Sequence, residues 1–377
     1  MRPSLAAMLL AAPALIALPA AADPLDKAIG AQLFQRNWVS APSSTRSNDG
    51  LGPLYSASSC AACHPGGGAG PAPAIRFGRG ISGDPVYGRA LQSYGVLGLA
   101  GEGRADVVYG GGKPEIRLSG LNDGPLDPAT RIGLRKAPSL FGFGAIAALG
   151  DDAILAGENA SGRKGRAHRL PDGRIGRFGW KATTADLIDQ TSFAFSLDIG
   201  LSTAAYPDAY GDCTERESAC RAKPSGSDHG EAEMPAFIVA ALAAYVGSLP
   251  APRPAENPAG ARAFEATGCA ACHTPLLRDR QGHAAQAFSD LLLHDMGSDL
   301  DDGVAEAGAA SAEWRTTPLS GLGARLDKGE RLLHDGRART AEEAIAAHGG
   351  DGAAARDLYA EAPASVRAAL LDYLKGL

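Results

Sequence analysis

Two copies of one five-residue motif offer the clearest chemistry in this sequence. Cys60-Ala-Ala-Cys63-His64 and Cys269-Ala-Ala-Cys272-His273 are identical and lie in opposite halves of the chain. Cys-x-x-Cys-His is the attachment pattern of haem c, in which both thiols bond to haem vinyl groups and the imidazole becomes an axial iron ligand. The sequence therefore predicts two covalently bound haem c groups. Cys60, Cys63, Cys269 and Cys272 would hold them, with His64 and His273 on the irons.

Two other chemistries also use closely spaced cysteines. A structural zinc site needs a second cysteine pair at a fairly short interval, and a redox dithiol has no use for the adjacent histidine. Both remain alternatives for a single motif. The exact repeat, histidine included, favours haem.

The region after the second motif is rich in possible distal iron ligands. A filled sixth position on the iron favours electron transfer, whereas an open one permits ligand activation. His348 follows a helix expected to begin near Thr340 and precedes two glycines, so it is the favoured ligand. A histidine there could instead cap the helix, and a methionine among leucines is usually a core residue. The rivals are Met296, His294 and His334.

The region after the first motif is poorer in such ligands. The helix expected from Thr184 has no histidine or methionine at the point that corresponds to His348, and it carries Gln190, with Asp198 shortly after it. This predicts an open iron face with Asp198 as the acid/base that peroxide activation needs. Asp198 could equally be an ordinary loop carboxylate, and His168 could ligate the iron instead.

Six cysteines leave two outside the motifs. Cys213 and Cys220 are close in sequence and predict a disulfide, which requires an oxidising compartment. The N-terminus agrees, because Arg2, an apolar run to Leu18 and Ala20-Ala21-Ala22 read as a signal peptide over residues 1–22. A membrane anchor is the weaker alternative. We expect an exported, periplasmic protein whose mature chain has no membrane span.

Composition is consistent with a cofactor-centred core. The chain has 377 residues, of which 45% are hydrophobic and only 6% aromatic, with 49 glycines and 25 prolines. That mixture predicts short helices and loops around a large apolar cofactor. The net charge of -6 argues against a general nucleic-acid binder.

The order of predicted elements indicates a tandem repeat. Gly30–Phe34 resembles Gly260–Phe264, and each segment opens a helix ahead of a haem motif. Arg135-Lys-Ala-Pro138 likewise parallels Arg315-Thr-Thr-Pro318. An apolar helix over Phe237–Leu249 precedes a proline-rich linker. The weak strand signals fall at 75–77, 106–109 and 115–118.

These patterns predict a mainly α fold of two tandem cytochrome c-like haem domains with long loops and small β insertions. Residues 23–250 would form an N-terminal haem c domain enlarged by insertions, and residues 251–377 a C-terminal cytochrome c-like domain.

Several longer segments resemble one known family. They are Asp49-Gly-Leu-Gly-Pro-Leu-Tyr55, Gly176-Arg-Phe-Gly-Trp-Lys-Ala182, Leu291-Leu-Leu-His-Asp-Met-Gly297, Glu313-Trp-Arg-Thr316 and Leu333-His-Asp-Gly-Arg-Ala338. Together with the haem motifs they resemble the di-haem oxidoreductase family, also called thiol oxidoreductase-like, which is distantly similar to bacterial di-haem cytochrome c peroxidases. No cysteine is left over to support a thiol oxidoreductase activity.

The resemblance implies an N-terminal peroxidatic haem and a C-terminal electron-transfer haem, often with a calcium ion between them. A small redox protein would donate electrons, and peroxide or another small oxidant would accept them. Gln190 and Asp198 then match the catalytic positions, and His348 the distal ligand. The relatives often have Glu for Asp198, and Met or Tyr for His348. A non-enzymatic di-haem electron carrier and a redox accessory protein in metal (iron) uptake are the alternatives.

Overall fold

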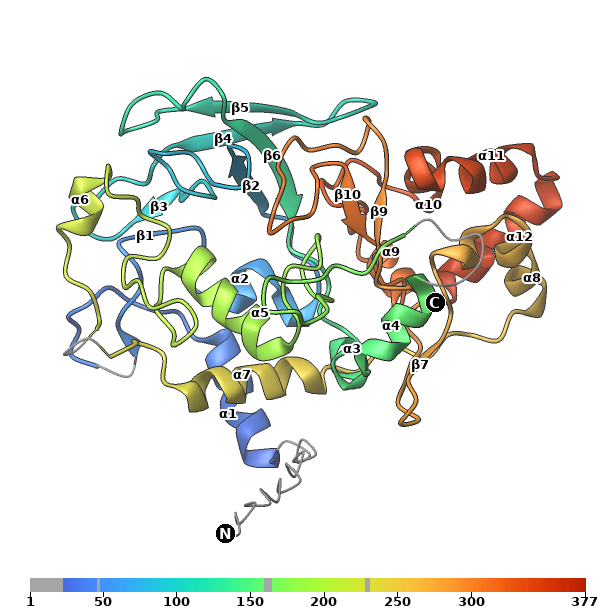
Figure 1. Cartoon of the computed structure of the whole chain (residues 1–377), viewed down its shortest axis with the longest axis horizontal. Coiled ribbons are helices and arrows are strands. Elements are labelled where there is room, and N and C mark those ends of the chain that lie inside the picture. Colours follow the sequence, from blue (N-terminus) through green and yellow to red (C-terminus); the bar gives the residue numbers. More distant parts are fainter. Residues whose placement is uncertain (1–22, 46–47, 159–164, 228–230) are drawn as a thin grey trace, which may run out of the picture.

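The computed structural model describes residues 23–45, 48–158, 165–227 and 231–377. The predicted signal peptide and His229 lie outside these residues. Of the described residues, 33% are helical, and the sheets are small. In Figure 1 most helices of the first half lie on the left and those of the second half on the right, with α3 (Phe143–Ala148) and α4 (Asp151–Glu158) of the first half beside β7 (Leu277–Arg278) and β8 (Ala284–Ala285) of the second.

The helices of the two halves are short and are joined by long loops. The first half contains α1 (Pro24–Gln35), α2 (Cys60–Cys63), α3 (Phe143–Ala148), α4 (Asp151–Glu158), α5 (Leu187–Ala194), α6 (Ser218–Arg221) and α7 (Ala236–Ser248). The second half contains α8 (Pro258–Ala266), α9 (Leu322–Asp327), α10 (Ala341–Ala346), α11 (Ala353–Glu361) and α12 (Ala364–Lys375). The apolar helix predicted before the linker is confirmed as α7.

One helix-pairing arrangement occurs in both halves. Helix α1 packs on α7, and a Cβ added at Gly30 would lie 2.1 Å from the Ala241 carbonyl oxygen. Helix α8 packs on α12, and a Cβ at Gly260 would lie 2.4 Å from the Tyr373 Cβ. Only glycine permits these close approaches. The phenylalanine four residues later is buried in each helix, so the predicted repeat has a physical basis in the packing.

Ten short strands form five two-stranded antiparallel sheets in the described chain. The pairs are β1 (Leu54–Tyr55) with β3 (Tyr94–Gly95), β2 (Pro73–Gly78) with β6 (Arg131–Lys136), β4 (Arg104–Val108) with β5 (Glu115–Ser119), β7 (Leu277–Arg278) with β8 (Ala284–Ala285), and β9 (Leu293–Asp295) with β10 (Glu313–Arg315). Strands β2, β4 and β5 confirm the three weak strand signals in the insertions.

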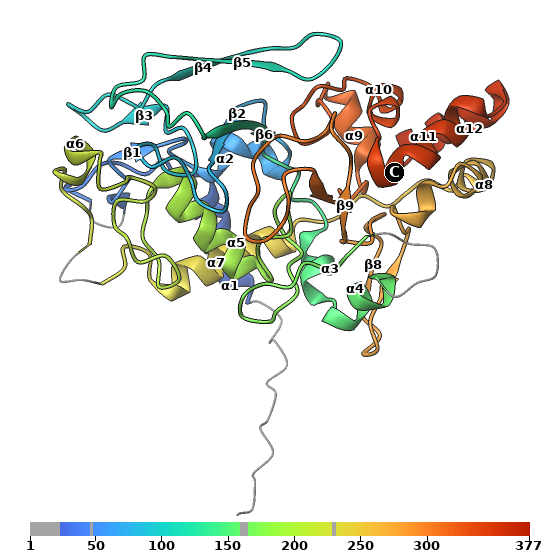
Figure 2. The ribbon, with the colours of Figure 1, turned by 45° about the horizontal axis from the view of Figure 1, so that its top comes forward.

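The β4–β5 hairpin lies along one edge of the molecule and reaches toward the second half (Figures 1 and 2). Just beyond its strands, the Lys113 ammonium donates to the Asp301 carbonyl, and Arg331 lies 4.1 Å from the Tyr109 ring centre. The largest core cluster also includes residues from both halves, such as Phe34 and Leu291. The domain boundary at residue 250 stays a prediction. The second half has a core cluster of its own, and a few of its residues also join the largest cluster, which comes mostly from the first half.

One predicted helix start is wrong. The helix expected from Thr184 begins at Leu187, because Asp186 is the N-cap and its side chain accepts from the Asp189 N–H. The Thr184 hydroxyl instead donates to Gln190 Oε1 at 2.9 Å. The start at Thr340 is confirmed, since that hydroxyl accepts from the Glu343 N–H.

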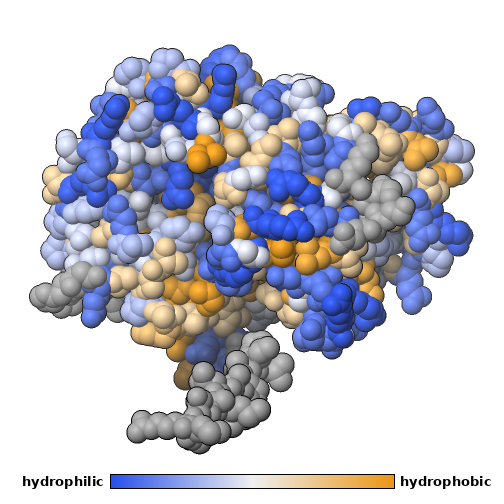
Figure 3. Space-filling model, viewed as in Figure 1, coloured by the Kyte–Doolittle hydropathy of each residue, from blue (hydrophilic) through white to orange (hydrophobic). Residues whose placement is uncertain are grey.

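The predicted disulfide between Cys213 and Cys220 is confirmed. Within the described ranges, no helix has the length and apolar character needed to cross a membrane. The face drawn in Figure 3 is largely hydrophilic, with separate apolar patches.

Candidate functional site

Both Cys-x-x-Cys-His segments form one tight backbone turn. The His64 N–H donates to the Cys60 carbonyl at 2.9 Å, and the His273 N–H donates to the Cys269 carbonyl at the same distance. All four cysteines of the motifs are unbridged and half-buried. Each motif therefore presents two thiols and one imidazole from a single turn.

Each motif lines its own cavity. The first cavity has a volume of about 100 Å³ and is bordered by Cys60, Cys63 and His64. The second is larger, about 400 Å³, and is bordered by Cys269, Cys272 and His273. We call them the N-terminal and the C-terminal cavity.

A second histidine faces His273 across the C-terminal cavity. The ring centres of His273 and His348 lie 6.4 Å apart. A metal–imidazole bond of roughly 2 Å on each side, plus about 1.1 Å from nitrogen to ring centre, requires about 6.2 Å. The two rings are therefore spaced as the axial ligands of one iron would be.

Hydrogen bonds leave the same nitrogen of each ring available. His273 Nδ1 contacts the Phe288 carbonyl at 3.0 Å, and His348 Nδ1 contacts the Ala344 carbonyl at 2.7 Å. A carbonyl at Nδ1 fixes the tautomer in which Nε2 carries the lone pair for a metal. Burial lowers the pKa of His273 to about 4 and also lowers the pKa of His348. Both rings are therefore neutral near pH 7, as iron ligation requires.

The rival ligands also line the C-terminal cavity, but the two histidines among them are engaged elsewhere. His294 Nε2 is 2.9 Å from Asp290 Oδ2. Although burial opposes it, this hydrogen bond together with the Cys272 thiol raises the pKa of His294 to about 10. His334 is stacked on Trp314, with ring centres 3.7 Å apart. Met296 remains the alternative to His348, because both side chains border the cavity at Gly352: a Cβ added there would lie 3.0 Å from Met296 Cε and 3.1 Å from His348 Cδ2.

The N-terminal cavity has different side chains opposite its motif. Gln190 of α5 and Asp198 of the π-helical turn η3 (Phe195–Ile199) border it, together with Thr191 and Phe195. Among the described residues that line it, His64 is the only histidine, and there is no methionine. A π-helical turn widens the helix and often marks a functional site.

His168, the alternative ligand for the first iron, does not line either cavity. It is buried, and its Nδ1 and Nε2 each lie 2.8 Å from a backbone carbonyl, of Lys181 and of Ala307. Both ring nitrogens therefore have partners within the protein. His168 connects two loops rather than facing a cofactor.

Asp198 has a cationic partner that the sequence did not indicate. Arg76 Nη2 lies 3.4 Å from Asp198 Oδ1, and the two side chains are 15% and 32% exposed. Arg76 comes from β2, far from Asp198 in sequence, so only the tertiary structure brings them together.

The backbone around Asp198 is held by a chain of buried polar groups. The Asp198 carbonyl accepts from the Ser56 and Ala57 N–H groups. Next to it, Gln92 Nε2 donates to the Leu197 carbonyl at 2.7 Å, and the Gln92 N–H donates to Glu102 Oε2 at 2.6 Å.

Glu102 in turn interacts with Glu217, and both carboxyl groups are almost fully buried. Burial raises the pKa of each of them. One of the two carboxyls therefore keeps a proton near neutral pH.

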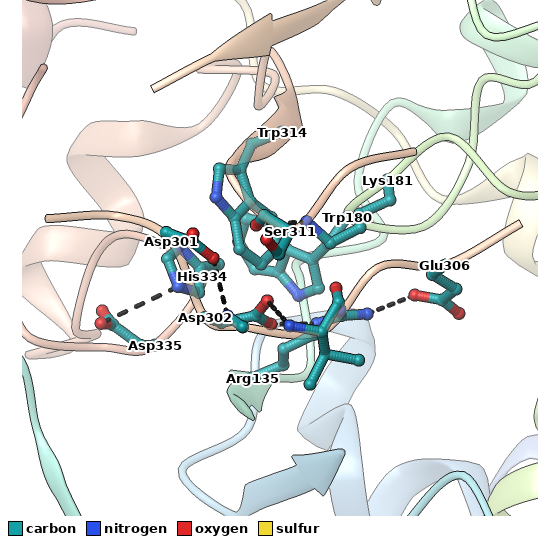
Figure 4. Close-up of polar contacts among 12 residues, drawn as sticks. Arg135, Trp180, Lys181, Asp301, Asp302, Glu306, Ser311, Trp314, His334 and Asp335 are labelled. Carbon is teal, nitrogen blue, oxygen red and sulfur yellow. Dashed lines mark hydrogen bonds and ion pairs between the residues drawn. The ribbon is translucent and has the colours of Figure 1, made fainter. Parts of the chain in front are cut away.

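Two tryptophans occupy the seam between the halves (Figure 4). Trp180 and Trp314 both line the C-terminal cavity, with ring centres 6.5 Å apart. The Lys181 ammonium lies 3.6 Å from the Trp314 ring centre and donates to three backbone carbonyls at 2.8–3.0 Å. Trp38 instead packs against Phe195 in the core of the first half.

The residues of both cavities fit a covalently held haem. Each cavity offers two unbridged thiols and an adjacent imidazole, although the remaining cysteine pair of the chain is oxidised. The histidine spacing across the C-terminal cavity supplies a second, independent fit. In zinc sites four ligands usually meet at one point, and neither motif brings a second cysteine pair.

Within the described ranges, the one group of three acidic, thiol or imidazole ligands is Cys272, Asp290 and His294. Calcium prefers a shell made entirely of oxygen, which this group does not offer. Calcium therefore stays a prediction.

Comparison with known proteins agrees with this site. The family described as "Di-haem oxidoreductase, putative peroxidase" matches residues 119–377, and the chain belongs to it. The expected resemblance is thereby confirmed. No curated protein matches the chain significantly.

Several solved structures are distantly similar. The di-haem peroxidase BthA of Burkholderia thailandensis is 17% identical with a TM-score of 0.39, covering 86% of this chain and 71% of its own. A MauG-like protein associated with microbial copper homeostasis is 16% identical with a TM-score of 0.41, covering 94% and 89%. Hydrazine synthase of Kuenenia stuttgartiensis is 14% identical with a TM-score of 0.36, covering 100% of both chains.

Proposed function

We propose that this protein is a periplasmic di-haem enzyme that reduces peroxide in its N-terminal cavity with electrons that enter at its C-terminal cavity. The observation that carries the proposal is the contrast between the two cavities. Two imidazoles face each other in the second, whereas a carboxylate and an amide face the histidine of the first. Saturated coordination suits electron transfer, and an open face suits reaction with peroxide.

Six side chains would hold the two cofactors at the motifs. Cys60 and Cys63 would form the thioether bonds of one haem, and Cys269 and Cys272 those of the other. His64 and His273 would be the proximal ligands, with His348 as the distal ligand of the second. When bound, haem supplies the redox-active iron on which a peroxide oxygen can be reduced.

Asp198 is the proposed acid/base. Reduction of hydrogen peroxide to two waters consumes two electrons and two protons, and one peroxide proton must move to the departing oxygen. A carboxylate bordering the cavity can take this proton and return it. Gln190 borders the same cavity and can orient peroxide through its amide. Arg76 does not line the cavity and acts through Asp198, whose charge it balances.

The electron donor would be a small redox protein. Trp180 and Trp314 line the C-terminal cavity and would carry electrons from it toward the first half. The periplasmic location rests on the N-terminal sequence pattern and the disulfide.

The decisive experiment uses the exported, haem-loaded protein. Mass spectrometry and the alkaline pyridine spectrum should give two haem c groups. Electron paramagnetic resonance should give one low-spin signal and one high-spin signal, the latter present at the latest after one-electron reduction. Steady-state assays should show turnover of hydrogen peroxide with a reduced small cytochrome as the donor.

Two low-spin signals at every stage, without peroxide turnover, would instead identify an electron carrier. Faster turnover with ferric complexes than with peroxide would identify a role in iron uptake.

A further inference from the structure

One arginine in the C-terminal cavity lacks an anionic partner. Arg315 is the last residue of β10, lines this cavity and is 2% exposed. Its Nε donates to the Gly179 carbonyl at 2.9 Å, and its Nη1 donates to the Thr316 carbonyl at 3.1 Å. In the described chain Arg315 makes no ion pair, so its charge is compensated only by backbone carbonyls.

The nearest acidic group is already in use. Asp290 is the carboxylate that acts on Arg315 at longer range, but Asp290 Oδ2 contacts His294 Nε2 and its Oδ1 accepts from the Leu292 N–H. Burial lowers the pKa of Arg315 to about 10 in spite of Asp290. A buried cation without a directly bonded anion is costly, and such charges are normally paired.

Two other arginines at this cavity do have carboxylate partners. Arg325 also lines it, and its Nη2 and Nε contact Glu330 Oε1 at 2.6 and 3.0 Å. Arg356 lines it as well and contacts Asp357 Oδ1 at 2.8 Å.

The repeat sharpens this contrast. Arg135, which stands at the position of Arg315 in the repeated Arg-x-x-Pro segment of the first half, pairs with both Asp302 and Glu306. Figure 4 shows Arg135 between these two carboxylates. The equivalent guanidinium of the second half has no such partners within the protein.

We propose that Arg315 is the anion anchor of the C-terminal cavity and binds a propionate carboxylate of its haem. The inference rests on the proposed function, since it requires a haem in this cavity. The Nε bond to Gly179 and the Nη1 bond to Thr316 fix the plane of the guanidinium and leave Nη2 for the ligand. Guanidinium and carboxylate form strong, charge-assisted hydrogen bonds. A cation held at the haem edge also disfavours the more positive, oxidised iron. Arg315 would therefore raise the midpoint potential of this haem.

The test uses three variants of the haem-loaded full chain. R315Q removes the charge, R315K keeps the charge without the planar set of donors, and R280Q is the control, since Arg280 is 87% exposed and does not line the cavity. The measurements are haem content, the midpoint potential of the low-spin haem, and the resonance Raman band of propionate bending. We expect R315Q to lower the potential and shift the band, R315K to shift the band while largely keeping the potential, and R280Q to change neither.

An unchanged potential and band in R315Q that still carries two haems would overturn the anchor. If R315Q does not load haem, the test rests on R315K. An unchanged propionate band in R315K would then contradict the proposed role of Arg315. A wild-type protein without haem in the C-terminal cavity would contradict the proposed function itself, and the pyridine spectrum detects this before any variant is compared.

Discussion

The two haem motifs have the same residues and close the same turn, yet the segments that face them differ. In the second half α10 ends at Ala346, and His348 follows directly, with its ring toward His273. In the first half α5 continues into the π-helical turn η3, which brings Asp198 to the cavity. The attachment motif thus fixes where a haem would bind, and the segment across the cavity determines what its iron could do.

The surroundings of the two cavities differ in the same way. Long insertions surround the N-terminal cavity and supply Arg76 and the chain from Gln92 to Glu217. The C-terminal cavity is enclosed by short helices and has an unpaired Arg315 in the described chain. A proton-transfer site needs charged groups with adjustable protonation, whereas an electron-transfer site needs fixed ligands and a fixed field.

The largest expected effect is on proton transfer in the N-terminal cavity. Replacing Asp198 by Asn should lower kcat/KM for hydrogen peroxide by roughly 10²–10⁴-fold, because an amide cannot carry the proton. Steady-state assays at saturating donor would measure this, and the haem spectra should not change. D172N is the control, since Asp172 is half-exposed and pairs with Arg174. Full activity in D198N would assign proton transfer to another group.

The second prediction concerns the distal position of the C-terminal cavity. H348A should convert the low-spin signal of this haem to a high-spin one, making the two cavities alike. H348M should keep a low-spin signal and raise the midpoint potential, because His/Met coordination lies higher than bis-His coordination. H283A is the matched control, as His283 is half-exposed and bonded to Asp279. If H348A leaves the low-spin signal intact and M296A removes it, Met296 is the ligand.

The disulfide should stabilise only the first half. Cys213 and Cys220 pack with Leu54, close to the first motif in sequence. Replacing both by Ser should reduce the free energy of unfolding by about 2–3 kcal/mol, as loop closure predicts for such a short loop. Denaturant unfolding followed at each haem would separate the halves. Equal losses at both haems would show that the shared core couples the two halves completely.

The buried carboxyl pair predicts a pH dependence confined to the first half. Burial raises the folded-state pKa of Glu217 to about 7, above its ordinary range, so the folded chain holds a proton that the unfolded chain releases. Stability should therefore be highest below about pH 5 and fall as pH rises toward 7. E217Q should flatten this fall and add roughly 2 kcal/mol at pH 8. E215Q is the control, with a side chain that is 85% exposed. If the stability of E217Q falls with pH as steeply as that of the wild type, Glu217 is not the cause of the pH dependence.

The smallest expected effect belongs to Arg76. R76Q should lower kcat/KM for peroxide by about fivefold, because a partly exposed ion pair near a reaction centre contributes on the order of 1 kcal/mol. Its effect should grow at low salt, where charges are less screened. R79Q is the control, since Arg79 follows in the same region and pairs with Asp127. An R76Q variant as active as R79Q would limit Arg76 to positioning the loop.

Local signals in the sequence located much of this architecture. The haem motifs, α7, the Thr340 cap, the three insertion strands and the disulfide all depend on residues close together in the chain. The predicted start of α5 was wrong because two possible capping residues, Thr184 and Asp186, lie within three positions of each other. Arg76 and Arg315 were not identified, because an arginine has no sequence pattern that says which partner its charge will meet.

The sequence by itself determined that two equivalent attachment turns exist and that candidate ligands are unequally distributed after them. Only the tertiary structure narrowed the choice among those ligands, to His348 and Met296. His348, Met296, His294 and His334 all reach one cavity, but hydrogen bonds and stacking engage the last two. A ligand needs a free lone pair aimed at the metal. Whether that lone pair is free depends on the neighbouring groups, which the fold brings from distant parts of the chain.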